Sequence, residues 1–137
     1  MNLNIKRKDC RFYVDKENRK VVCVIPNTKN LVLDYVSDFG MYWSLEGRHI
    51  FDNLRMPNQF TGIATCNEKD EFDEETGKLI AYNKAKEKLN NSFFKRANKF
   101  VNYCGKQLDT VVDSLNDFGR RLTEGAEKRE AMIKERV

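Results

Sequence analysis

The feature that most constrains this chain is a stretch of helical periodicity, from about Glu74 to Cys104, that contains no proline. At about 1.5 Å per residue, such a helix would be roughly 45 Å long. Its apolar residues fall on two sides, with Leu79, Tyr82, Leu89, Phe93, Phe100 and Cys104 on one and Ile80, Phe94 and Val101 on the other. An apolar arc of this width predicts that the helix is covered by a sheet and also by a second helix or a second chain.

Three segments before this helix have the pattern of β-strands. Cys10–Val14 alternates, Lys20–Ile25 is rich in β-branched residues, and the polar Asp15–Arg19 between them predicts the turn of an antiparallel hairpin. Phe60–Cys66 predicts a third strand, and the small residues on one of its faces indicate that another element packs closely there. A short amphipathic helix is predicted over Leu31–Phe39.

Beyond the long helix, the sequence predicts a turn and a second helix. Gly105 is a typical helix stop, and Lys106–Leu122 carries an apolar stripe, so an antiparallel helical hairpin is expected. The predicted fold is therefore α+β, with a small antiparallel sheet (the N-terminal hairpin plus a third strand) packed on a long C-terminal helical hairpin. Residues 1–122 are expected to form a single domain, and residues 123–137 a charged, weakly helical tail.

The composition narrows the class of protein without identifying it. The 137 residues carry a net charge of +4, which is compatible with an anionic partner but does not require one. The four cysteines form no CxxC pair and His49 is the only histidine, so neither a metal site nor a cofactor is expected. The sequence has no signal peptide and no apolar run of about 18 residues, which predicts a cytoplasmic protein that does not cross a membrane.

The acidic segment Glu68–Glu75 has two interpretations. Carboxylates just before a helix cap its free N–H groups and favour the positive end of its dipole, which makes Asp70 or Asp73 the expected cap. Alternatively, Glu68, Asp70 or Asp73 would bind Mg²⁺ in a nuclease. The capping interpretation is the better one. The sequence also lacks the GxGxxG, GxxxxGK[ST], HExxH and GxSxG motifs, so the protein is not predicted to be an enzyme.

Positive charge is concentrated on the long helix. Residues 78–106 hold eight lysines and arginines against the single Glu87. Four of the lysines form a stripe: Lys84, Lys88, Lys95 and Lys99. The stripe is either an ordinary solvated face or a surface that attracts phosphates.

Arg96 is set apart from this stripe, because its helical angle places it between Phe93 and Phe100. A partly buried guanidinium there needs an anion, since an unpaired buried charge is costly. One solution is a salt bridge to an aspartate of the following helix: Asp109, Asp113 or Asp117. The other is a ligand phosphate, with an aromatic ring nearby to stack a base.

The run FTGIATC…DEFDEETGKLIAYNKAKEKLNNSFFKRANKFVN resembles a segment of small proteins from phages and prophages of Gram-positive bacteria. The resemblance covers roughly residues 56–122, and the acidic-Phe-acidic…Gly-x-x-x-Ala pattern is its most specific part. In layout the chain is similar to the Thoeris anti-defence family of nucleotide sponges, which sequester a cyclic ADP-ribose signal without cleaving it. That similarity implies an N-terminal sheet, C-terminal helices, oligomers with ligand pockets between subunits, and a location in the host bacterial cytoplasm.

These observations predict a non-catalytic phage counter-defence protein that sequesters an anionic signalling nucleotide, either cyclic ADP-ribose-like or a cyclic oligonucleotide. A homodimer or higher homo-oligomer is expected. The expected ligand residues are Arg96, Lys88 and Lys99 for phosphates, Phe93 or Tyr82 for the base, and Arg11 or Arg120 and Arg121 to complete the site. The alternatives are an anti-CRISPR-like inhibitor that binds a bacterial immune protein, and a weakly basic nucleic-acid-binding phage protein.

Overall fold

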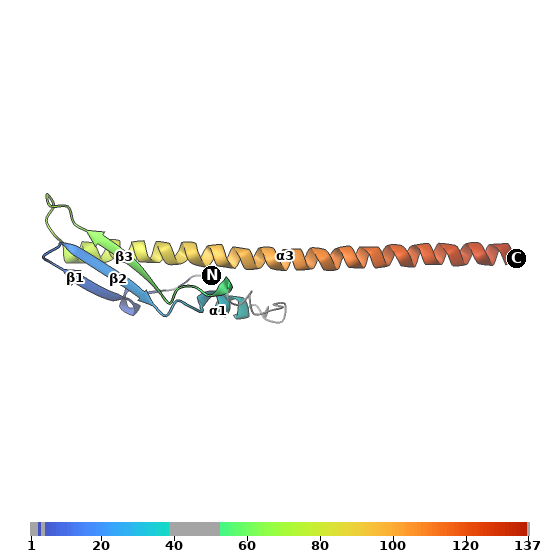
Figure 1. The fold of residues 1–137 in the computed structure, drawn as a ribbon, viewed down its shortest axis with the longest axis horizontal. Helices are drawn as coiled ribbons and strands as arrows, with labels where there is room; N and C mark the ends of the chain where they lie inside the picture. Colours follow the sequence, from blue (N-terminus) through green and yellow to red (C-terminus); the bar gives the residue numbers. More distant parts are fainter. Residues whose placement is uncertain (1–2, 4, 39–52, 137) are drawn as a thin grey trace. The chain divides into compact units, whose positions relative to one another are not determined.

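A computed structural model describes residues 3, 5–38 and 53–136, which form two compact units, Met1–Phe100 and Val101–Val137. The predicted α+β class is confirmed (Figure 1). The elements are a 3-10 turn η1 (Arg7–Asp9), strands β1 (Arg11–Asp15), β2 (Lys20–Pro26) and β3 (Gln59–Thr65), and helices α1 (Leu31–Asp38) and α3 (Glu74–Arg136). His49 lies outside the described residues.

The three strands form one antiparallel sheet in the order β1-β2-β3, so the predicted hairpin and third strand are confirmed. In the register, Cys23 of β2 lies opposite Phe12 of β1 and Gly62 of β3. Successive side chains of a strand point to opposite faces. Val21, Cys23 and Ile25 are accordingly buried, while the residues between them are only half-buried.

The core of the first unit lies between this buried sheet face and the first part of α3. The helix contributes five buried residues to it: Ala81, Tyr82, Ala85, Leu89 and Phe100. Contact is closest at Gly62, where a Cβ atom would lie 2.0 Å from the Ala81 carbonyl oxygen and 2.5 Å from the Ala85 nitrogen. Only a glycine fits between strand and helix at this separation. The expected close approach to β3 is therefore confirmed.

The acidic segment caps α3, as the capping interpretation predicts. The Asp73 carboxylate accepts hydrogen bonds from the Glu75 backbone N–H at 3.1 Å and from the Thr76 hydroxyl at 2.7 Å. These bonds, that from Thr76 first, lower the pKa of the Asp73 carboxyl below its ordinary value. The helix therefore begins where a side chain satisfies its first free N–H groups.

The predicted helical hairpin is wrong. Helix α3 continues through Gly105 and includes both Lys106–Leu122 and residues 123–136, without a turn between them. A glycine in a helix interior costs only about 1 kcal/mol relative to alanine, and each further residue adds a backbone hydrogen bond, so helix propagation overrides a single weak position. The predicted domain boundary at residue 122 falls inside this helix, whereas the two compact units divide after Phe100.

Candidate anion-binding site

A cavity of about 210 Å³ lies in the first unit and is lined almost entirely by basic side chains. Its lining residues are Asn53, Arg55, Lys95, Arg96 and Lys99. Three of them come from α3, and the other two precede β3 in the chain. We call this feature the cationic cavity. Lys95, Arg96 and Lys99 of α3 bring like charges together around this small volume, and an anion among them would relieve their repulsion.

Arg96 is held in position by neutral oxygen atoms. Its Nε donates to the Arg55 carbonyl at 3.1 Å, and its Nη1 donates to the hydroxyl and to the backbone carbonyl of Ser92, the latter at 3.4 Å. The side chain is half-buried. These bonds orient the guanidinium without neutralising its charge.

The alternative of a salt bridge from Arg96 to Asp109, Asp113 or Asp117 is not supported, because no ion pair within the described ranges includes Arg96. Asp117 instead pairs with Arg120 and Arg121. The physical reason is the continuity of α3: the expected second helix would have to turn back to bring those aspartates to Arg96, and no turn forms.

The lysine stripe divides into two pairs with different surroundings. Lys84 donates to the Ile63 carbonyl at 3.1 Å, and Lys88 donates to the Thr61 carbonyl at 2.9 Å. These carbonyls belong to β3, which is an edge of the sheet, so the two lysines of α3 occupy acceptors that another strand could otherwise use. Lys95 and Lys99 are exposed and line the cationic cavity. Lys88, predicted to hold a phosphate, is thus engaged with the sheet.

The two aromatic residues expected to stack a base do not line the cationic cavity. Phe93 packs against Tyr35 of α1, with ring centroids 5.4 Å apart and ring planes at 58°. Tyr82 is buried, and its hydroxyl donates to the Ile5 carbonyl. It also precedes Arg96 by fourteen helical residues, which corresponds to roughly 21 Å along the axis. Both rings therefore serve the packing of the first unit.

The remaining predicted arginines lie elsewhere. Arg11 is exposed, and strand alternation places it on the sheet face opposite Phe12, whose ring lies 5.9 Å from the Lys78 ammonium of α3. The face that carries Arg11 therefore looks away from the helix. Arg120 and Arg121 belong to the second unit, where both form ion pairs with Asp117.

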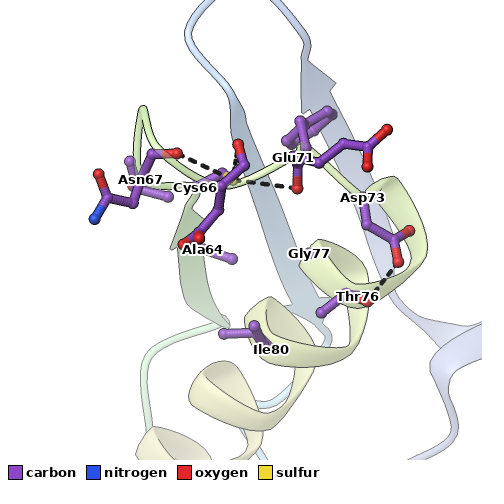
Figure 2. Close-up of a pocket in the computed structure, with 11 residues that line it drawn as sticks. Ala64, Cys66, Asn67, Glu71, Asp73, Thr76, Gly77 and Ile80 are labelled. Carbon is purple, nitrogen blue, oxygen red and sulfur yellow. Dashed lines mark hydrogen bonds between the residues drawn. The ribbon is translucent and has the colours of Figure 1, made fainter.

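A second cavity, of about 300 Å³, lies where β3 leads through the acidic segment into α3 (Figure 2). The Cys66 sulfur lies 3.5 Å from the Asn67 carbonyl and 3.7 Å from that of Glu71. The Arg19 guanidinium donates to the Glu68 carbonyl at 3.3 Å and to the same sulfur at 3.5 Å. These contacts close the loop on itself. Within the described ranges, no three potential ligands among histidine, cysteine, aspartate and glutamate gather to hold a metal ion.

Sequence reasoning missed two lining residues of the cationic cavity, Asn53 and Arg55. They follow an aperiodic segment that carries no motif, and nothing in their spacing relates them to a helix forty residues further on. The hydrogen bond from Arg96 to the Arg55 carbonyl joins the two segments. The sequence places Lys95 in the lysine stripe, but helical periodicity does not distinguish its surroundings from those of Lys84 or Lys88.

Comparisons with known proteins identify no relative of this chain. No family model matches the chain, and neither the curated proteins nor the solved structures contain a match. Among the helices of the described residues, none combines the length and the apolar character needed to span a bilayer.

Proposed function

We propose that the protein binds a phosphate-bearing anion in the cationic cavity. We further propose that it acts in the host cytoplasm as a non-catalytic phage counter-defence protein that sequesters a signalling nucleotide, either cyclic ADP-ribose-like or a cyclic oligonucleotide. The observation that carries the proposal is the cavity itself, in which Arg55, Lys95, Arg96 and Lys99 converge.

Arg96 has the properties of a preorganised phosphate ligand. Its Nε and Nη1 are committed to Arg55 and Ser92, and its Nη2 has no hydrogen-bond partner among the residues described. A guanidinium already fixed in position loses little conformational entropy when it binds an anion, and the N–H groups of Nη2 would donate charge-assisted hydrogen bonds to a phosphate. Lys95 and Lys99, one helical turn apart, add two mobile charges that adjust to the ligand.

The size of the cavity limits what it holds. Ligand pockets usually measure about 300–1,000 Å³, whereas the cationic cavity measures about 210 Å³. This volume suits a phosphoryl or pyrophosphoryl group, with the rest of the nucleotide outside. The base would then be recognised by a surface beyond the five lining residues. Sequestration without turnover requires binding groups alone, and the cavity offers cations and an amide.

The first experiment is calorimetric titration of the full chain with pyrophosphate, cyclic ADP-ribose and a panel of cyclic dinucleotides. We expect at least one of them to bind and to raise the melting temperature, because a ligand that binds only the folded state stabilises it. The double variant Lys95→Gln/Lys99→Gln should bind at least tenfold more weakly. These lysines make no hydrogen bond or ion pair with the described residues, so the variant should remain folded.

The matched control is Lys106→Gln/Lys134→Gln, which removes the same charge from exposed positions of the second unit. If both double variants lose affinity equally, the binding is a net-charge effect and the site assignment is wrong. If no compound of the panel binds, the proposal fails. Recovery of the intact nucleotide from the heated complex tests the non-catalytic part, and recovery of a cleaved product would contradict it.

Salt dependence separates a discrete nucleotide from a nucleic acid. A protein that neutralises several phosphates of a duplex loses about 10³–10⁵-fold in affinity between 50 and 200 mM salt. A single phosphoryl group in the cationic cavity should show a much shallower dependence. A mobility shift of duplex DNA or RNA at low salt that is tighter than any nucleotide binding would favour the nucleic-acid alternative.

A further inference from the structure

The second unit carries an apolar stripe, continuous from Val101 to Leu122, that nothing in the described part of the chain covers. Its large apolar side chains are between 45% and 66% exposed: Val101, Leu108, Val111, Val112, Leu115, Phe118, Leu122, Met132 and Ile133. Three of them, Val111, Leu115 and Phe118, line an open groove of about 500 Å³ together with Thr110 and Ser114. In water, so much apolar surface on a helix without tertiary packing is unfavourable.

The spacing of the stripe is that of a coiled coil. Val101, Leu108, Leu115 and Leu122 recur every seven residues and define the a positions of a heptad. Cys104, Val111, Phe118, Gly125 and Met132 occupy the d positions. A repeat of seven residues keeps its apolar seam facing a partner helix only when two helices supercoil around each other. The surface therefore fits another helix with the same repeat.

We propose that residues 101–136 pair with the same segment of a second copy of this chain, as an antiparallel coiled coil. This proposal is independent of the cationic cavity. Three properties of the segment argue for a second copy in this orientation: its flanking positions, its distribution of charge and the layers that self-pairing would form.

The first property is the composition of the positions beside the seam. The e positions are all small or apolar: Gly105, Val112, Gly119, Ala126 and Ile133. The g positions are polar or charged: Gln107, Ser114, Arg121, Lys128 and Glu135. In a parallel pair, e positions flank the g positions of the partner, whereas in an antiparallel pair e flanks e and g flanks g. Only the antiparallel arrangement places the apolar flanks together. A Cβ added at Gly105 or Gly119 meets nothing within 4 Å, so this flank is open to a partner.

The second property is charge. Residues 101–136 hold seven basic and seven acidic side chains, so two copies do not repel each other as wholes. The charges are nevertheless segregated, because residues 101–119 carry a net charge of −2 and residues 120–136 a net charge of +2. Antiparallel pairing sets the negative half of one copy beside the positive half of the other. Parallel pairing would set like charges together, which is unfavourable.

The third property is the register. In the register that sets Leu115 opposite Phe118 of the second copy, each a residue lies opposite a d residue. The first such layer pairs Val101 with Met132 of the second copy, and the last pairs Met132 with its Val101. All of these layers lie within the second unit. In this register Leu108 lies opposite Gly125, so a large side chain faces a small one. Arg129, one of two charged residues at a positions (the other is Arg136 at the end of the segment), lies opposite Cys104, near the end of the seam. Large-to-small pairing and a charge near the end both favour a packed centre.

The first test is sedimentation equilibrium of the full chain. We expect a dimer that Leu115→Asp converts to a monomer, with at least a tenfold weaker self-association. Asn116→Asp, an identical charge change at the neighbouring outward position, should remain a dimer. Protection of the buried Cys23 thiol from alkylation shows whether the first unit of each variant is folded. The proposal is overturned if the unmodified chain is monomeric at 100 µM, or if folded Leu115→Asp remains a dimer.

Orientation is tested through Cys104, in full chains whose other cysteines are replaced (Cys10→Ser, Cys23→Ala, Cys66→Ser). The oxidant is a diazene, which converts two thiols into one disulfide and is itself reduced to a hydrazine. In an in-register parallel dimer the two Cys104 side chains would be neighbours and would form a 104–104 disulfide. The antiparallel dimer should not form this link. After Arg129→Cys, it should form a 104–129 disulfide, identified by mass spectrometry of peptides. A 104–104 disulfide as the main product would overturn the orientation.

Discussion

Helix α3 has an apolar stripe along most of its length, but its two parts have opposite surroundings. Up to Phe100, the face toward the sheet is buried, with Ala81, Ala85 and Leu89 fully covered. Other apolar side chains of this part, Leu79, Ile80 and Phe94, are between 42% and 72% exposed. From Val101 onward, comparable side chains are exposed, among them Leu115 at 66% and Leu108 at 63%. The same secondary structure therefore obtains its stability from different sources in the two units.

The comparison also applies to charge. In the first unit the basic side chains of the helix have distinct tasks, since Lys84 and Lys88 cap the edge of β3 while Lys95, Arg96 and Lys99 line the cationic cavity. In the second unit Arg120 and Arg121 pair locally with Asp117. Our proposals accordingly assign ligand binding to the first unit and self-association to the second. Five predictions test this division. The first four concern stability and are given in order of decreasing effect, and the fifth concerns thiol reactivity.

The largest effect is expected at Gly62. In Gly62→Val, the new side chain would meet the α3 backbone at Ala81 and Ala85, and overpacking against backbone should cost about 3 kcal/mol or more in the free energy of unfolding. Urea denaturation followed by circular dichroism measures the loss. The matched change in the second unit is Gly105→Ala, where the added Cβ meets no atom within 4 Å. It should stabilise the helix by up to about 1 kcal/mol. Equal losses would contradict the difference in packing.

The next effect compares two leucines. Leu89 is fully buried, so Leu89→Ala should cost about 2–5 kcal/mol of unfolding free energy through the cavity it leaves. Leu115 is 66% exposed, so Leu115→Ala should change the stability of the first unit by less than about 0.5 kcal/mol while it weakens self-association. Chemical denaturation and sedimentation velocity measure the two properties. A loss of more than 2 kcal/mol from the first unit in Leu115→Ala would show that the units are not separable.

A smaller effect is expected within the first unit at Tyr82. Tyr82→Phe removes the hydroxyl that donates to the Ile5 carbonyl and should cost about 1 kcal/mol. Tyr13→Phe, on an exposed side chain of β1, should be neutral within about 0.5 kcal/mol. Thermal denaturation of both variants provides the comparison. If Tyr82→Phe instead lost nucleotide binding without losing stability, the Tyr82 hydroxyl would have a role in binding and not in packing.

The smallest effect at neutral pH is the titration of Cys23. Burial, with a further contribution from the neighbouring Cys10 thiol, raises the pKa of the Cys23 thiol from 9.0 to about 12. The unfolded chain loses this proton first, so the stabilising contribution is complete below about pH 9 and is lost as the pH rises toward 12. Unfolding free energies at pH 8 and pH 10 should therefore differ less in Cys23→Ala than in the unmodified chain.

Thiol alkylation compares the two units directly. Iodoacetamide at pH 8 should leave Cys23 unmodified until the first unit unfolds, because the thiolate is the reactive form and this thiol is buried. Cys104 is only half-buried in a single chain and should react faster in Leu115→Asp than in the self-associated protein. Equal rates in the two proteins would argue that no partner covers Cys104.

Local chemistry made much of the first unit predictable. The sequence predicted Lys20–Ile25 as a strand, and β2 spans Lys20–Pro26. It also predicted a helix from about Glu74 with Asp73 as a possible cap, and the structure has both. Strand alternation, turn composition and N-capping act over a few residues, so they can be read directly from the chain. The turn predicted at Gly105 is wrong because helix formation is cooperative over many residues. The small cost of one glycine does not end a helix that continues on both sides of it.

The sequence by itself determined the α+β class, the order of the elements, the start of the long helix and its content of positive and apolar residues. Only the tertiary structure decided how those residues are used. Asn53 and Arg55 line the same cavity as Arg96, although about forty residues separate them in the sequence. Lys88 donates to a carbonyl at the edge of β3, whereas Lys99 lines the cavity. The reason is physical: periodicity fixes the direction of a side chain from its own helix, but its partner is fixed by which distant segment packs there.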